Sequence, residues 1–172
     1  MHTLYTIGHS TRTFEQFLAL LQAHNIQMVV DVRTIPKSRR NPQFGQDILV
    51  AALKEAGIEY IHMEKLGGLR HTTKDSLNTG WQNTSFRGYA DYMATDAFQQ
   101  GLAELKALAE QKRVAILCAE AVPWRCHRSL IADALTTQGW QVLHIQSQKT
   151  AKTHELTPFL HLAGNKIIYP AQ

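Results

Sequence analysis

Short apolar runs and longer amphipathic stretches alternate along most of the chain. Five segments have the length and the apolar or β-branched content of strands, namely residues 4–7, 28–32, 59–62, 114–118 and 140–145. The run at 114–118 is apolar at every position, which is typical of a strand that is covered on both faces. The pattern therefore predicts a largely buried sheet.

Between these segments, apolar residues recur at three- and four-residue spacing, as on one face of a helix. Residues 13–24 show this spacing best, with Thr13 as the expected N-cap and Gln16 as its capping-box partner. We expect helices at 13–24, 48–56, 89–111 and 128–138. The third is long, and Thr95 and Gly101 are the places where it could break.

Two segments lack a regular apolar period. Residues 65–88 are rich in Gly, Thr, Ser and Asn and are expected to form a long loop. A loop of this length in a compact domain is usually functional or disordered. The segment from about Gln148 is polar, and we expect it to wander rather than to hold a fixed position.

The order of these elements predicts the fold class. Strands that alternate with helices form a parallel sheet with helices on both faces. We expect a single α/β domain over residues 1–172, with a mostly parallel sheet of about five strands in a Rossmann-like, doubly wound arrangement. The length of 172 residues suits one domain with its own core.

Composition and charge exclude several classes of protein. The hydrophobic fraction of 44% and only two cysteines argue against a disordered chain and a disulfide scaffold. The sequence shows no secretory signal and no apolar run long enough for a membrane helix, so we expect a cytoplasmic protein with free thiols and no membrane partner. The formal charge of +4 permits a phosphate or nucleic-acid partner without requiring one.

Polar side chains follow several of the predicted strands. In an open α/β sheet, ligands bind outside the carboxyl ends of the strands. Arginine suits phosphate recognition, and exposed aromatic rings can stack on unpaired bases. The candidate substrate-binding residues chosen on these grounds are His9, Ser10, Asp31, Arg33, Lys37, Ser38, Arg39, Arg87 and Tyr89. A solvated basic loop is the alternative interpretation of the run at 33–40.

Two cysteines carry the candidate chemistry. Cys126 opens the helix at 128–138 beside His127 and Arg128, and a helix N-terminus with nearby cations lowers a thiol pKa. Cys118 ends a buried strand and is either a core residue or a second reactive thiol. Glu120 could act as a general base, or it could pair with an arginine. The predicted catalytic residues are Cys118, Glu120, Cys126, His127 and Arg128.

Two other chemistries fit the spacing poorly. Zinc signatures use cysteine pairs two to four residues apart, whereas seven residues separate Cys118 from Cys126, so we assign no metal ligands. A cysteine-phosphatase loop needs an arginine six positions after the thiol, but Trp124 stands there. A metal site of Cys118, Cys126 and His127, with His9 as a further ligand, remains the third hypothesis.

Taken together, these motifs resemble the DUF488 family of uncharacterised prokaryotic α/β proteins. The resemblance rests on residues 6–10, 30–33 with Pro36 and Ser38, 66–68, 86–90, 118–120 and 126–128, in the order of the family. It implies an α/β domain whose signature residues are the strand-end groups named above, and it adds Gly67 and Gly68 to the candidate substrate-binding residues. It implies no particular activity.

Our functional prediction is an enzyme that acts on a phosphate-bearing substrate, either a nucleotide or a nucleic acid. A non-catalytic module that binds nucleotides or nucleic acid is the alternative, and the cysteine–histidine metal site is the second alternative. The sequence indicates neither a cofactor nor an oligomeric state.

Overall fold

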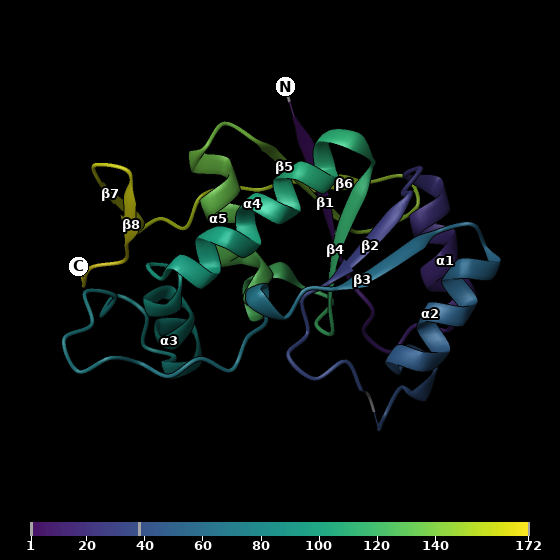
Figure 1. The fold of residues 1–172 in the computed structure, drawn as a ribbon, viewed down its shortest axis with the longest axis horizontal. Coiled ribbons are helices and arrows are strands. Elements are labelled where there is room, and N and C mark those ends of the chain that lie inside the picture. The colour runs from purple at the N-terminus through teal and green to yellow at the C-terminus, as the bar shows by residue number, and fades with distance from the viewer. Residues whose placement is uncertain (1, 38, 172) are drawn as a thin grey trace.

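Six strands form the central sheet in the order β3-β2-β4-β1-β5-β6 (Figure 1). The structure is a computed structural model that describes residues 2–37 and 39–171. The first five strands are parallel, and β6 joins β5 in antiparallel fashion. The strands are β1 Thr3–Gly8, β2 Met28–Asp31, β3 Glu59–His62, β4 Val114–Cys118, β5 Gln141–Ile145 and β6 Ala151–Thr153. The predicted α/β class with a mostly parallel sheet is confirmed.

Helices cover both faces of this sheet. The helices α1 (Phe14–Ala23) and α2 (Gln46–Glu55) bury Phe17, Leu49 and their neighbours against one face. The opposite face is covered by α3 (Thr84–Tyr92), α4 (Asp96–Gln111) and α5 (Arg128–Thr137). Three short 3-10 turns complete the order, at Pro42–Phe44, Glu64–Leu66 and Pro123–Arg125. None of the described helices is long and apolar enough to span a bilayer.

The helix termini follow local capping chemistry. Thr13 caps α1 in the predicted capping box, because its side chain accepts from Gln16 and the Gln16 side chain accepts from its backbone. The helix predicted at 89–111 is broken near Thr95, one of the two expected places, and Thr95 caps the second of the two helices. The first of them starts at Thr84, inside the expected loop, because the Asn83 side chain accepts from the backbone of the first turn.

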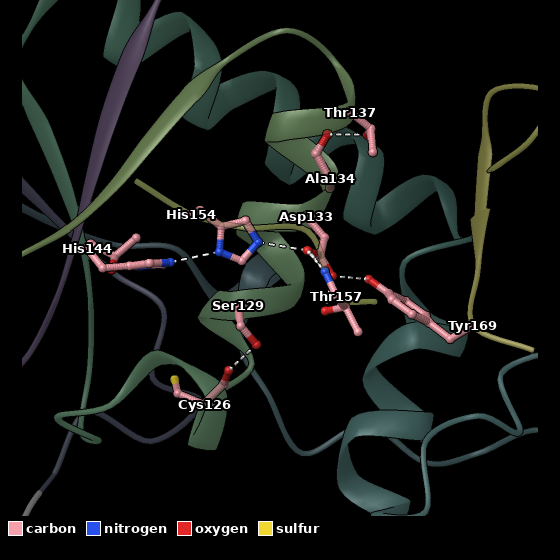
Figure 2. A network of polar contacts seen from close by, with 10 residues as sticks. Cys126, Ser129, Asp133, Ala134, Thr137, His144, His154, Thr157 and Tyr169 are labelled. Carbon is pink, nitrogen blue, oxygen red and sulfur yellow. Dashed lines mark hydrogen bonds and ion pairs between the residues drawn. The ribbon is translucent and has the colours of Figure 1, made fainter. Parts of the chain in front are cut away.

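The polar segment after Gln148 does not wander, contrary to the sequence-based expectation. It adds β6 and the hairpin of β7 (His161–Ala163) and β8 (Lys166–Ile168), and it buries Tyr169 completely. Figure 2 shows its attachment to α5. The buried Asp133 carboxylate accepts from His154 Nε2 at 2.7 Å, Tyr169 Oη at 2.8 Å, and the backbone and hydroxyl of Thr157. These contacts join residues at least 21 positions apart, beyond the reach of a local pattern.

Replacement of Asp133 by alanine is therefore expected to release this segment. The change removes the acceptor of four buried donors, and each unsatisfied buried group costs about 1–3 kcal/mol. We expect a loss of roughly 3 kcal/mol or more in the free energy of unfolding by urea. Limited proteolysis should then cut after residue 148 in Asp133→Ala. Asp47→Asn, on an exposed position of α2, is the control. Equal unfolding midpoints for the two variants would contradict this assignment.

The connections place the switch point of the sheet between β1 and β4. β1 continues through α1 on one face of the sheet, whereas β4 continues through α5 on the other face. Because β1 and β4 are neighbours, the loops that leave their carboxyl ends diverge at this point. Ligands of open α/β sheets bind at such a point, where adjacent connections go to opposite faces.

Candidate functional site

The carboxyl ends of β1 and β4 bring Gly8 directly beside Cys118. The pairing continues past both strands, since His9 N donates to Cys118 O at 3.0 Å and Ser10 N to Ala119 O at 2.8 Å. The loop after β4 then crosses over Gly8. A β-carbon on Gly8 would collide with the Glu120 carbonyl and lie 2.6 Å from Arg128 Nη1, so this close approach requires glycine.

Arg128 occupies the centre of the site, and only 1% of it is exposed. Its Nη1 donates to Cys118 Sγ at 2.8 Å and to the Glu120 carbonyl at 2.7 Å, while Nη2 donates to the Ala121 carbonyl at 2.9 Å. Arg128 therefore bonds the backbone carbonyl of Glu120 and not the Glu120 carboxylate. That carboxylate is exposed, and no described residue pairs with it.

The two thiols share one buried environment but differ in acidity. Burial by itself would raise the pKa of Cys118, but a hydrogen bond from Cys126 and the charge of Arg128 outweigh it and lower that pKa. Burial raises the pKa of Cys126 well above its usual value. The sequence placed the acidic thiol at Cys126. The structure favours Cys118, because Cys118 contacts the guanidinium, whereas Cys126 accepts only the Arg128 backbone N–H at 3.4 Å.

His127 lies next to the thiols as a neutral ring. Its Nε2 lies 2.9 Å from the Val32 carbonyl, and its Nδ1 lies 3.8 Å from Cys126 Sγ. Burial lowers the pKa of His127 to about 4. A carbonyl only accepts, so a ring proton on Nε2 satisfies the Val32 carbonyl, and the Leu66 carbonyl is a second acceptor beside the ring. Gly68 makes room for this ring, because a β-carbon there would lie 3.2 Å from Nδ1.

Other predicted residues form a second cluster on the α1–α2 face. Arg33 donates through Nε and Nη2 to the buried Asp31 carboxylate and through Nη1 to the Phe44 carbonyl. His9 stacks on Phe44 with ring centroids 4.5 Å apart, and its Nδ1 bonds the Ser10 carbonyl at 2.8 Å. The guanidinium of Arg33 is therefore occupied within the protein rather than presented to a ligand.

The remaining candidates divide between the surface and the interior. Lys37 and Arg39 are exposed beside Arg40, whereas Ser38 lies outside the described residues. Arg87 donates to the Trp81 carbonyl, and Tyr89 is a core residue that donates to the Leu66 carbonyl. A β-carbon on Gly67 would lie 3.1 Å from the Glu64 carbonyl oxygen and 3.2 Å from Thr34 Oγ1, so a larger residue would crowd this turn. Trp124 has a largely exposed side chain, at 67%, whereas the other candidates for stacking are half-buried or buried, namely Tyr60, Trp81, Phe86 and Tyr89.

Sequence reasoning missed a strained backbone at this edge of the sheet. Leu69, which follows Gly68, has φ 57°, and Ser10 has φ 52°. Left-handed backbone is unfavourable for a leucine, and such residues gather at functional sites. Leu69 is also exposed. The leucine carries no signal of this conformation, because leucine is not a turn-forming residue.

The geometry gives no support to the metal hypothesis. Within residues 2–37 and 39–171, no group of three or more His, Cys, Asp or Glu side chains could hold a metal ion. In addition, the Arg128 guanidinium contacts Cys118 Sγ, where it already supplies the positive charge that a metal would bring.

Comparison with known proteins leads to one family. Neither a curated protein nor a solved structure matches the chain. The family model described as "Domain of unknown function DUF488" matches residues 13–135. This range contains every motif of the resemblance except residues 6–10. The protein therefore belongs to the DUF488 family, whose function is unknown.

Proposed function

We propose that the protein is an enzyme that acts on a phosphate-bearing substrate, a nucleotide or a nucleic acid, with Cys118 as its nucleophile. The contact of 2.8 Å between Arg128 Nη1 and Cys118 Sγ carries this proposal. A thiolate beside a buried cation is an activated nucleophile, whereas structural core cysteines are inert. The free cysteines also suit a reducing compartment, and we assign the protein to the cytoplasm on that ground.

The neighbouring groups supply the other parts of a covalent reaction. In the proposed step, Cys118 Sγ forms a bond to the electrophilic atom of the substrate while the bond to the leaving group breaks. The leaving group departs with the electron pair and takes a proton from solvent. Water then releases the second product, and once the loop has opened the His127 ring accepts the proton of that water. The exposed Glu120 carboxylate is the second candidate base.

The cations at the same edge support a phosphate-bearing substrate. Lys37, Arg39, Arg40 and Arg125 are exposed, and no described residue forms an ion pair with them. The loops that carry them adjoin, since they follow the neighbouring strands β2 and β4. Trp124 adds an exposed ring on which a base could stack, which favours a nucleotide or unpaired nucleic acid over a simple phosphate ester.

Access to Cys118 requires a movement of the loop after β4. Cys118 is 2% and Cys126 is 6% exposed, and the loop over them is held by the bonds from Arg128 to the Glu120 and Ala121 carbonyls. Substrate therefore reaches Sγ only when these two bonds open. Loops over active sites commonly open in this way on microsecond to millisecond timescales.

Site-resolved alkylation tests the proposed nucleophile. Iodoacetamide labelling across pH, followed by mass spectrometry, should give Cys118 an apparent pKa below the free value of ~8.5, because Arg128 stabilises its thiolate. Cys126 should react only after unfolding. Arg128→Gln should raise the apparent pKa of Cys118, whereas Arg125→Gln, at an exposed arginine nearby, should leave it unchanged. Two thiols that stay inert until the protein unfolds would reject a nucleophilic role.

The burial of both thiols favours a second candidate, a nucleotide or nucleic-acid binding module without chemistry. Its affinity would depend on the exposed cations and would fall as salt rises, because phosphate contacts release counterions. A Cys118→Ser protein that binds single-stranded oligonucleotide as tightly as wild type, together with inert thiols, would favour this module over the enzyme.

A further inference from the structure

An open cavity of about 610 Å³ lies on the α1 face of the sheet, away from the thiols. Its walls are the start of α1 and the turn that joins β5 to β6. This volume is within the range of pockets that hold small molecules. The cavity is lined by the cations Arg12 and Lys149, by the carboxamides of Gln16, Gln146 and Gln148, and by Leu20 and Ser147. No acidic side chain is among its described lining residues.

The lining groups leave hydrogen-bond donors available. Arg12 gives one N–H to the Gly8 carbonyl, and no described carboxylate forms an ion pair with its guanidinium. Gln16 Oε1 accepts from Thr13 N at 2.9 Å, so its amide NH₂ remains as a donor. The Lys149 ammonium is exposed and has no described partner. Cationic groups and hydrogen-bond donors that have no acidic neighbours can bind an anionic ligand.

The wall formed by the β5–β6 turn is fixed in place. Ser147 Oγ lies 2.7 Å from Thr150 Oγ1, and Gln146 N donates to Thr150 O at 3.0 Å. The Ser147 carbonyl also bonds His24 Nε2 of the α1 side at 2.8 Å. These bonds hold the turn that carries Lys149 in place, which reduces the entropy cost of binding.

We propose that this cavity binds a small organic phosphate of about the size of a nucleoside monophosphate. Arg12 and Lys149 take the phosphate, and the three carboxamides take the polar edge of the organic group. This site goes beyond the proposed function. It is separated from Cys118 by the end of β1, because Gly8 contacts Arg12 through its carbonyl and faces Arg128 on its other side.

Calorimetric titration of the full chain tests this site, with AMP as the probe and inorganic phosphate and adenosine for comparison. We expect AMP to bind one site per chain more tightly than inorganic phosphate, and adenosine not to bind measurably. Lys149→Glu should weaken AMP binding at least tenfold. Lys74→Glu makes the same charge change at an exposed lysine outside the cavity and should leave the affinity within twofold.

The outcomes separate this site from the thiol site. Cys118→Ser should bind AMP as wild type does, even if the alkylation experiment rejects Cys118 as a nucleophile. Equal losses in Lys149→Glu and Lys74→Glu would show attraction by overall charge and would overturn the proposal. Loss of AMP binding in Cys118→Ser would indicate that AMP binds at the thiol site, and it would overturn the proposal. The absence of saturable AMP binding would overturn the proposal as well.

Discussion

Gly8→Ala should be among the most destabilising substitutions in this protein. The new methyl group meets the Glu120 backbone carbonyl, which cannot move alone, and the Arg128 guanidinium, which is held by bonds to Cys118 Sγ and to the Glu120 and Ala121 carbonyls. Relief requires the loop after β4 to move away, and that movement breaks the bonds from Arg128 to this loop. We expect a loss of more than about 4 kcal/mol in the free energy of unfolding, which is exceptional for one methyl group.

Urea unfolding of Gly8→Ala against Gly45→Ala checks this expectation. A β-carbon on Gly45 lies no closer than 3.3 Å to another atom, so its cost should stay near 1 kcal/mol or below. If Gly8→Ala folds, the displaced loop should expose Cys118 and speed its alkylation. A Gly8→Ala protein as stable as Gly45→Ala would show that the loop does not approach β1 this closely.

The second large effect is a loss of stability in mild acid. Burial lowers the pKa of His127 to about 4 and that of His144 to about 3. The unfolded chain therefore binds more protons than the folded protein below a pH of about 6.5, and stability falls as the pH falls. At 1.36 kcal/mol per pKa unit, His127 alone costs about 3 kcal/mol by pH 4. His144 adds to this loss.

Urea unfolding at a series of pH values from 7.5 to 4 measures this loss. His127→Asn should be less stable than wild type at neutral pH. Its stability should fall less steeply as the pH falls, because this variant lacks one histidine whose pKa is lowered by burial. His71→Asn, at an exposed histidine, should keep the wild-type slope. A slope in His127→Asn that matches wild type would mean that His127 titrates normally in the folded protein.

The sequence predicts where the candidate groups gather but not how they pair. The carboxyl ends of parallel strands all lie at one edge of the sheet. The prediction of a parallel sheet was therefore enough to place Gly8 and Cys118 at the same edge. The face of the sheet toward which a side chain points depends on where its strand starts, because side chains alternate along a strand. Asp31 and Cys118 lie on opposite faces for this reason. The sequence therefore predicted one site where the structure has two clusters.

Contacts that depend on the path of a loop also could not be predicted from the sequence. Arg128 reaches Cys118 because the intervening loop folds back over Gly8, and no residue type in that loop demands this path. The sequence offered the Glu120 carboxylate as its partner, since charge is visible in a sequence and a backbone carbonyl is not. The helix cap at Asn83 is different, because asparagine before a Thr-Ser pair is a local signal that could have placed the start of α3.

The attachment of the C-terminal segment to Asp133 bears on how the protein forms during synthesis. Domains generally fold from the N-terminal side as the chain emerges from the ribosome. Here α5 carries a buried carboxylate whose donors, His154, Thr157 and Tyr169, are translated later. Until these residues have left the exit tunnel, the Asp133 carboxylate lacks its buried donors, and we expect the packing of α5 on the sheet to be weaker. Since α5 also holds Arg128, we expect the pairing of Arg128 with Cys118 to be completed only after His154, Thr157 and Tyr169 have been translated.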